Sequence, residues 1–200
     1  VIESQDTYHN NCLYVSAMKP ISGEDVAESD IFSQNLGRKI VDETGFGKFK
    51  SNEIEVGIAR EPEEFDKIFS LRSELYEKYG LLRFNNSKIH DIYDKDSILI
   101  YIKEGNNIFG TMRLTPNTDG IEKINMPCQE YFKELSGEKN LEISKFVVSS
   151  ENSRFLSYGF LMTKYANALA KDMGFDNMIG LTRKEVEKYT SKCGYNTFPS

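Results

Sequence analysis

The chain has 200 residues, of which 39% are hydrophobic and 28% charged, and its formal net charge is −6 at pH 7. This length suits one domain with a sizeable core, and the acidic balance argues against nonspecific binding of nucleic acid. No apolar run approaches the roughly 18 residues that a membrane-spanning helix needs, so we expect no integral membrane association.

The cysteines and histidines are few and scattered. Cys12, Cys128 and Cys193 are odd in number and far apart, a pattern that fits reduced thiols and predicts a cytoplasmic protein. His9 and His90 have no partner at metal-ligand spacing. We therefore expect neither a zinc site nor a Ser-His-Asp triad, and no cofactor.

The first part of the chain shows only weak periodicity. Residues 12–18 could form a strand and residues 23–41 a helix, after which two glycines indicate a loop. We interpret residues 1–50 as an extension that packs on a main domain of residues 51–200.

That domain opens with a strand and a helix. Residues 53–60 alternate between polar and apolar side chains, as a half-buried strand does. Pro62 suits the first turn of a helix, whose apolar residues recur on one face until Gly80. Arg72 and Tyr76 lie four apart and therefore share one face of this helix.

A hairpin and a connector follow. Residues 97–103 read as a buried strand, and residues 108–115 return after a short turn, so we predict a β-hairpin that ends at Pro116. Residues 117–140 form a connector with one short helix near 129–135.

The last part of the chain predicts a β-α-β unit. A strand at 141–148 leads through a polar turn into a helix at 155–173, and a further strand at 176–182 follows. The two strands should be parallel, and a helix at 183–193 closes the chain. The sequence thus predicts an α/β (α+β) fold, a mixed sheet with helices on both faces.

Three charged residues are candidates for chemistry. Glu142 could be a general base that takes a proton from an amine, or a carboxylate paired with Arg113 or Lys145 for structural reasons. Arg113 could bind a carboxylate or phosphate, pair with Glu142, or lie exposed. Arg72 could join them or extend its stem along an apolar face to water.

The geometry of a regular strand sets a condition on this cluster. Strict alternation places Glu142, Ser144, Phe146 and Val148 on one face and Lys145 on the other. Glu142 and Lys145 can therefore share a site only if a β-bulge lies between them.

The sequence resembles a known family in four ordered motifs. They are an Arg-x-x-x-Tyr helix, an Asp-rich loop, a Gly-Thr-Met-Arg-Leu-Thr-Pro strand at 110–116 and the Leu-Glu-Ile-Ser-Lys-Phe-Val-Val strand at 141–148. The chain is similar to the N-acyl amino acid synthases and acyl-homoserine-lactone (autoinducer) synthases, a branch of the GNAT N-acyltransferase superfamily. The likeness covers roughly residues 53–195.

The resemblance implies an enzyme that moves a fatty acyl group from acyl carrier protein, or from acyl-CoA, to an amine. It implies a charged substrate site with Glu142 as catalytic base, formed by Arg72, Tyr76, Asp94, Asp96, Arg113, Glu142 and Lys145. It also implies a pantetheine and acyl site, with a backbone N–H near Val147 or Val148 stabilising the oxyanion, formed by Phe146, Val147, Val148, Ser149 and Arg154.

One departure bears on the substrate. Lactone synthases usually show Glu-x-Ser-Arg, and Lys145 stands at the arginine position, which keeps the charge but loses the bidentate fork. We therefore expect an N-acyl amino acid synthase whose acceptor is an amino acid such as tyrosine. The alternatives are a lactone synthase that uses S-adenosylmethionine and a small-molecule acetyltransferase that uses acetyl-CoA.

Overall fold

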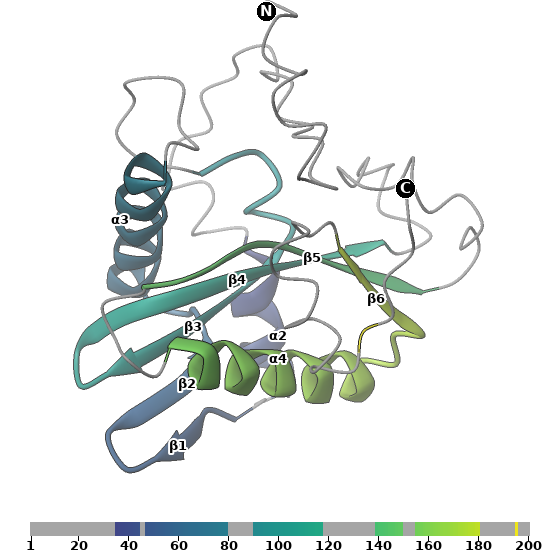
Figure 1. The fold of residues 1–200 in the computed structure, drawn as a ribbon. Helices are drawn as coiled ribbons and strands as arrows, with labels where there is room; N and C mark the ends of the chain where they lie inside the picture. The colour runs from purple at the N-terminus through teal and green to yellow at the C-terminus, as the bar shows by residue number, and fades with distance from the viewer. Residues whose placement is uncertain are drawn as a thin grey trace, which may run out of the picture.

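A computed structural model describes residues 35–44, 47–79, 90–117, 139–149, 155–180 and 195. These residues form one six-stranded sheet in the order β1-β2-β3-β4-β5-β6, with helices on both faces (Figure 1). Neighbouring strands are antiparallel except β5 and β6, which are parallel. The predicted mixed sheet is confirmed.

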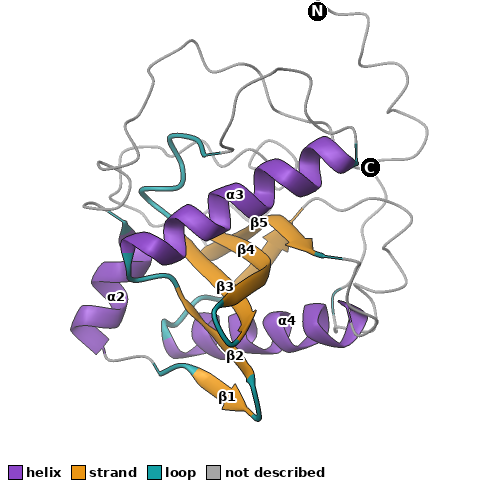
Figure 2. Cartoon of the chain, turned by 90° about the vertical axis from the view of Figure 1, so that its left-hand side faces the viewer, coloured by secondary structure: helices purple, strands orange, loops and turns teal. Residues whose placement is uncertain are grey.

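The helices divide between the two faces of the sheet. Helix α3 (Pro62–Lys78) lies on one face, and α4 (Phe155–Asp172) lies on the other (Figures 1 and 2). Helix α2 (Leu36–Thr44) packs on the α4 side, where Leu36 and Val41 join the larger apolar core. The smaller core lies under α3.

Strand β2 (Ile54–Ile58) and helix α3 form as the sequence predicts. The helix begins at Pro62, and the Glu64 carboxylate accepts the backbone N–H groups of Arg60 and Glu61, which have no partner within the helix. Strand β1 (Phe49–Ser51) was not predicted. It has only three exposed residues, which is too short for a pattern of alternation, and it forms by pairing with β2.

The predicted hairpin is confirmed as β3 (Ile98–Glu104) and β4 (Asn107–Asn117). The prediction that Pro116 ends the second strand is wrong, because Pro116 pairs with Leu141 inside β4. The pairing with β3 stops at Leu114, so at Pro116 the strand has a neighbour on one side only. A proline, which has no N–H, is tolerated at such a position.

The β-α-β unit is also confirmed. Strand β5 (Asn140–Val148) leads to α4 and then to β6 (Asn177–Gly180), which runs parallel to β5. Gly174, at a φ of +72°, takes the left-handed conformation just after the helix.

The helix expected over 23–41 differs from the structure. Helix α2 begins at Leu36 and runs on to Thr44, because the Asn35 side chain accepts the N–H of Arg38 and so marks the N-terminus of the helix. The predicted strand at 12–18, the short helix near 129–135 and the helix at 183–193 lie outside the described residues. None of the described helices is long and apolar enough to cross a membrane.

Candidate active site

A β-bulge in β5 organises the site. Ser144 pairs with Arg113 and Val147 with Thr111, so two residues of β5 face a single residue of β4. Lys145, the first of the two, has a φ of +50°, a left-handed conformation that glycine usually takes in such bulges. Glu142 and Lys145 can share a site only if a β-bulge lies between them, and the structure has this bulge.

The bulge changes which side chains share a face. Val148 packs with the larger core on the α4 side, as Ile143 does, and Val147 packs with the smaller core under α3. Strict alternation through residues 142–148 is therefore wrong after Ser144. The extra residue brings Lys145 onto the α3 face, where Arg113 and Ser144 already lie.

Arg72 and Asp94 form a fully buried ion pair under α3. Arg72 Nη1 lies 2.8 Å from Asp94 Oδ1, and both side chains are 0% exposed. The other Asp94 oxygen accepts the N–H of Asp91 at 2.8 Å. The alternative that Arg72 extends to water is thus wrong. Its Nε and Nη2 have no hydrogen-bond partner among the described residues.

Asp91 joins two cations of a charged cluster under α3. The members of this cluster are Arg72, Asp91, Asp94, Arg113, Glu142 and Lys145. One oxygen accepts from Arg113 Nη1, and the other lies 3.4 Å from Lys145 Nζ. Burial alone would raise the pKa of Asp91, but Arg113, Lys145 and Arg72 outweigh it and lower this pKa to about 2. Asp91 is therefore anionic at any working pH. Its side chain is 28% exposed, against 2% for Arg113 and 6% for Lys145.

Arg113 connects β4 to the bulge. Its Nε donates to Ser144 Oγ at 3.0 Å, and its Nη1 also lies 3.6 Å from Asp94 Oδ1. Burial disfavours the guanidinium, but Asp91, Asp94 and Glu142 raise its pKa above the ordinary value. The guanidinium also lies over the Tyr93 ring, 5.6 Å from its centroid.

The surroundings of Lys145 disfavour its positive charge. Burial lowers its pKa, and the nearby guanidinium groups of Arg113 and Arg72 lower it further, while Asp91 and Asp94 compensate only in part. Its Nζ lies 5.7 Å from the centroid of the Tyr76 ring, which places both predicted residues in one site.

Glu142 lies on the same face as the other members of this cluster. It pairs with Thr115 on β4, two residues from Arg113, and it is 3% exposed. Its charge contributes to the raised pKa values of Arg113 and of Tyr93, although burial and Asp91 have larger effects on Tyr93. Glu142 thus faces the charged groups under α3 and not the core under α4, as its predicted role requires.

The structure separates the two aspartates named from the sequence. Asp94 is central to the cluster, whereas Asp96 is half-buried and forms no ion pair with another described residue; its backbone N–H donates to Tyr93 in a turn. Asp91 takes the position expected of Asp96. The sequence predicted Asp94 and Asp96 from this loop and not Asp91, because the turn decides which carboxylates face Arg113 and the turn has no local sequence pattern.

The residues predicted to form the acyl site lie on β5 beyond its described pairing with β6. The described pairing with β6 ends at Ile143 and Gly180, and β5 continues to Val148. Beyond it, the N–H of Ser149 donates to Phe109 on β4 at 2.8 Å. Since backbone groups alternate along a strand, the N–H of Val148 points away from β4, towards the edge of β5 that pairs with β6 at residues 140–143.

Side chains around this segment differ in exposure. Phe146 is 36% exposed, the highest value among the described residues of β5 that were predicted to bind the acyl donor. Thr111, opposite Val147, has a buried Oγ1 without a hydrogen-bond partner among the described residues, and the sequence did not single it out. Arg154 lies outside the part of the chain that the structure describes.

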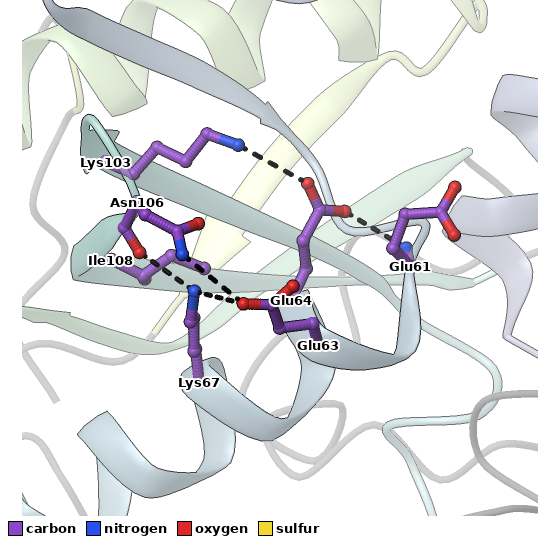
Figure 3. A pocket seen from close by; sticks show the side chains of 7 residues that line it. All are labelled: Glu61, Glu63, Glu64, Lys67, Lys103, Asn106 and Ile108. Atoms are coloured by element: carbon purple, nitrogen blue, oxygen red, sulfur yellow. Dashed lines mark hydrogen bonds and ion pairs between the residues drawn. The ribbon is translucent and has the colours of Figure 1, made fainter.

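A second polar cluster lies at the start of α3 and has a structural role. Figure 3 shows a pocket between the first turns of α3 and the β3–β4 turn. Lys67 bonds both Glu63 and the Asn106 carbonyl, and Lys103 lies near Glu64. These contacts join the helix to the hairpin, and every charge in them is matched. No cluster of metal-ligating residues occurs within the described ranges.

Known proteins resemble this chain in family and in fold. A family model described as the N-acyl amino acid synthase FeeM matches residues 67–195. No curated protein matches the sequence.

Solved structures extend the likeness to the fold. FeeM, an N-acyl amino acid synthase from uncultured soil microbes, gives a TM-score of 0.58 at 17% identity over 74% of this chain and 81% of that chain. A Trypanosoma brucei acetyltransferase gives 0.51 at 12%, over 74% and 95%. An aminoglycoside acetyltransferase from an uncultured soil metagenomic sample gives 0.51 at 12%, over 74% and 92%. The predicted GNAT-like fold is confirmed.

Proposed function

The chain belongs to the FeeM family of N-acyl amino acid synthases and is an N-acyltransferase; from this premise we propose its donor and its acceptor. The donor is a long-chain fatty acyl group on acyl carrier protein, and the acceptor is the α-amine of an amino acid such as tyrosine. The observation that carries the proposal is the bulged β5, which brings Lys145 into the buried charged cluster and directs the N–H of Val148 away from β4.

The donor site is supported by the direction of the backbone groups of β5 beyond Ile143. A pantetheine arm needs backbone partners for its amides, and the strand beyond Ile143 has groups that point away from β4. The N–H of Val148 could bind either a pantetheine amide or the oxyanion that forms when the amine attacks the thioester.

The acceptor site is supported by the charged cluster. Two donors of Arg72 have no partner among the described residues, and the carboxylate of an amino acid is an acceptor of matching charge and shape. Asp91, the most exposed charge of the cluster, could hold the ammonium group. Tyr76 and Tyr93 supply aromatic surface beside Lys145 and Arg113, which suits an aromatic amino acid.

The reaction is a direct displacement. The amine nitrogen attacks the thioester carbonyl, the C–N bond forms, and the C–S bond breaks to release the carrier's thiol. One base must take a proton from the ammonium before attack, and the sequence names Glu142 for this role. The step needs no group beyond the two substrates, so the proposal includes no cofactor. We also propose that the enzyme is located in the cytoplasm.

The proposal is tested with purified enzyme and a tyrosine acceptor. We expect N-acyl tyrosine by mass spectrometry with long-chain acyl carrier protein as donor, and little product with acetyl-CoA. Methylthioadenosine formed from S-adenosylmethionine would show a lactone synthase instead. Efficient acetyl transfer to small amines would show a small-molecule acetyltransferase, and either result would replace the proposal.

A further inference from the structure

We propose that Lys145 is the general base of the acyl transfer and takes the proton from the acceptor's ammonium group. This inference rests on the proposed function and deepens it. Two side chains of the cluster remain as bases, Glu142 and Lys145, and their positions in the fold differ.

The first argument is the cost of placing Lys145 in the cluster. A residue with a side chain at a φ of +50° is strained, and glycine would avoid this strain. Without the bulge, the side chain would point to the α4 face and its apolar core. The fold therefore accepts strain that brings an amine onto the α3 face.

The second argument is the surroundings of the amine. Its side chain is 6% exposed, and its Nζ lies 3.4 Å from Asp91, the most exposed member of the cluster. Burial and two guanidinium groups lower the pKa of Lys145, although Asp91 and Asp94 raise it in part, so this amine loses its proton more easily than an exposed lysine. The charged and titratable groups that face it come from α3, from the segment before β3, from β4 and from its own strand: Arg72, Tyr76, Asp91, Asp94, Arg113 and Glu142.

The third argument excludes most other members of the cluster. Asp91, with a pKa of about 2, is too weak a base. A guanidinium group cannot serve as a base, and Asp94 is occupied by Arg72 and by the N–H of Asp91. Among the carboxylates and amines of the cluster, this leaves only Glu142 as an alternative to Lys145.

The fourth argument is position along β5. Lys145 is three residues from Val148 and Glu142 is six, and the extra residue of the bulge shortens both intervals by about one residue. At about 3.3 Å per residue, the Cα atoms of Lys145 and Glu142 lie roughly 7 Å and roughly 16 Å from that of Val148. Lys145 is therefore the nearer of the two to the proposed oxyanion site.

The proton balance closes. The neutral Lys145 amine takes one proton from the ammonium held at Asp91, and the free amine attacks the thioester. The second proton leaves the amide nitrogen with the departing thiolate, which becomes the thiol. Lys145 then releases its proton to water beside Asp91, so each turnover produces one proton overall.

The kinetic test compares Lys145→Arg with Glu142→Gln. Arginine keeps the positive charge next to Asp91 but cannot lose its proton. We expect Lys145→Arg to lower kcat by about 10²–10⁴-fold with little change in KM. In the wild type, deprotonation of Lys145 should make kcat/KM rise with pH. Lys145→Arg should abolish this rise, whereas Glu142→Gln should keep it. The reverse pattern would assign the base to Glu142 and overturn the inference.

A second measurement does not depend on activity. The ¹³Cε signal of Lys145, assigned as the lysine signal that is missing in Lys145→Arg, is followed by NMR against pH in the full chain. A midpoint below the ordinary value of about 10.4 supports the inference, and a midpoint at or above it overturns it. If the wild-type enzyme makes no N-acyl product, the proposed function fails, and this titration still decides the state of Lys145.

Discussion

The charged side chains under α3 form one network of ion pairs and hydrogen bonds. Arg72 and Asp94 are fully buried, so their pairing fixes α3 against the segment before β3. Asp91 reaches partly to solvent and joins Arg113 and Lys145. Burial of this many charges is tolerated because each carboxylate has a cation beside it.

Removing one member of the buried pair should destabilise the protein strongly. Asp94→Asn leaves Arg72 charged and without its partner in a dry site, so we expect the free energy of unfolding to fall by about 3–5 kcal/mol. Urea denaturation monitored by circular dichroism measures this loss.

The matched control for this prediction is Asp96→Asn. Asp96 is two residues away and makes no ion pair with a described residue, so its loss should change the free energy of unfolding by about 0.5 kcal/mol or less. Equal losses for the two variants would show that Asp94 is not the special member of the loop.

At the scale of elements, two close approaches set the position of β5. Gly110 allows α4 to pack on β4, since a Cβ there would lie 2.7 Å from Ile102 Cγ2 and 3.2 Å from Met162 Sδ. Gly180 ends the described pairing of β6, and a Cβ there would lie 2.8 Å from the Ile143 carbonyl oxygen. These glycines fix where β5 and β6 meet, and so where the proposed donor site begins.

We expect Gly180→Ala to disturb this junction. The new methyl group meets a backbone oxygen, which cannot rotate away as a side chain can, so β6 must shift from β5. The free energy of unfolding should fall by about 1–3 kcal/mol, and KM for the acyl donor should rise.

Gly47→Ala is the control, because a Cβ at Gly47 meets nothing within 4 Å. This variant should match the wild type in thermal unfolding and in KM. A Gly180→Ala protein with wild-type stability and wild-type KM would contradict the proposed importance of the β5–β6 junction.

Charge is unevenly divided over the whole molecule. Residues 145–200 have eight Lys and Arg against five Asp and Glu, a balance of +3, whereas residues 1–144 have 17 against 26, a balance of −9. An acidic carrier protein would dock more favourably on surface formed by the C-terminal part.

This asymmetry predicts a salt effect on the donor. We expect KM for acyl carrier protein to rise as ionic strength increases from about 0.05 to 0.5 M, because exposed charges are screened over that range. The uncharged acyl-pantetheine with the same chain is the control, and its KM should stay nearly constant. Equal responses of the two donors would argue against electrostatic docking of a carrier.

Elements with strong periodicity could be predicted from local sequence alone. Alternation at 53–60 and 141–148, the proline start of α3 and the short turn between β3 and β4 are local signals, and each predicted element formed. The motif order also predicted the family, which the family model confirms. Charged residues at positions that otherwise face the core predicted most members of the cluster, because burial of a charge without a partner is costly.

The tertiary structure determines which of these residues come together in one site. The choice of Asp91 over Asp96 depends on a turn, and the face of Lys145 depends on one extra residue in β5. Neither the choice of Asp91 nor the face of Lys145 can be recognised from a local sequence pattern. Side-chain direction after a bulge, for example, follows from pairing with a strand some thirty residues away. The sequence supplied the amine and the carboxylates, and the register of β4 against β5 put them in one site.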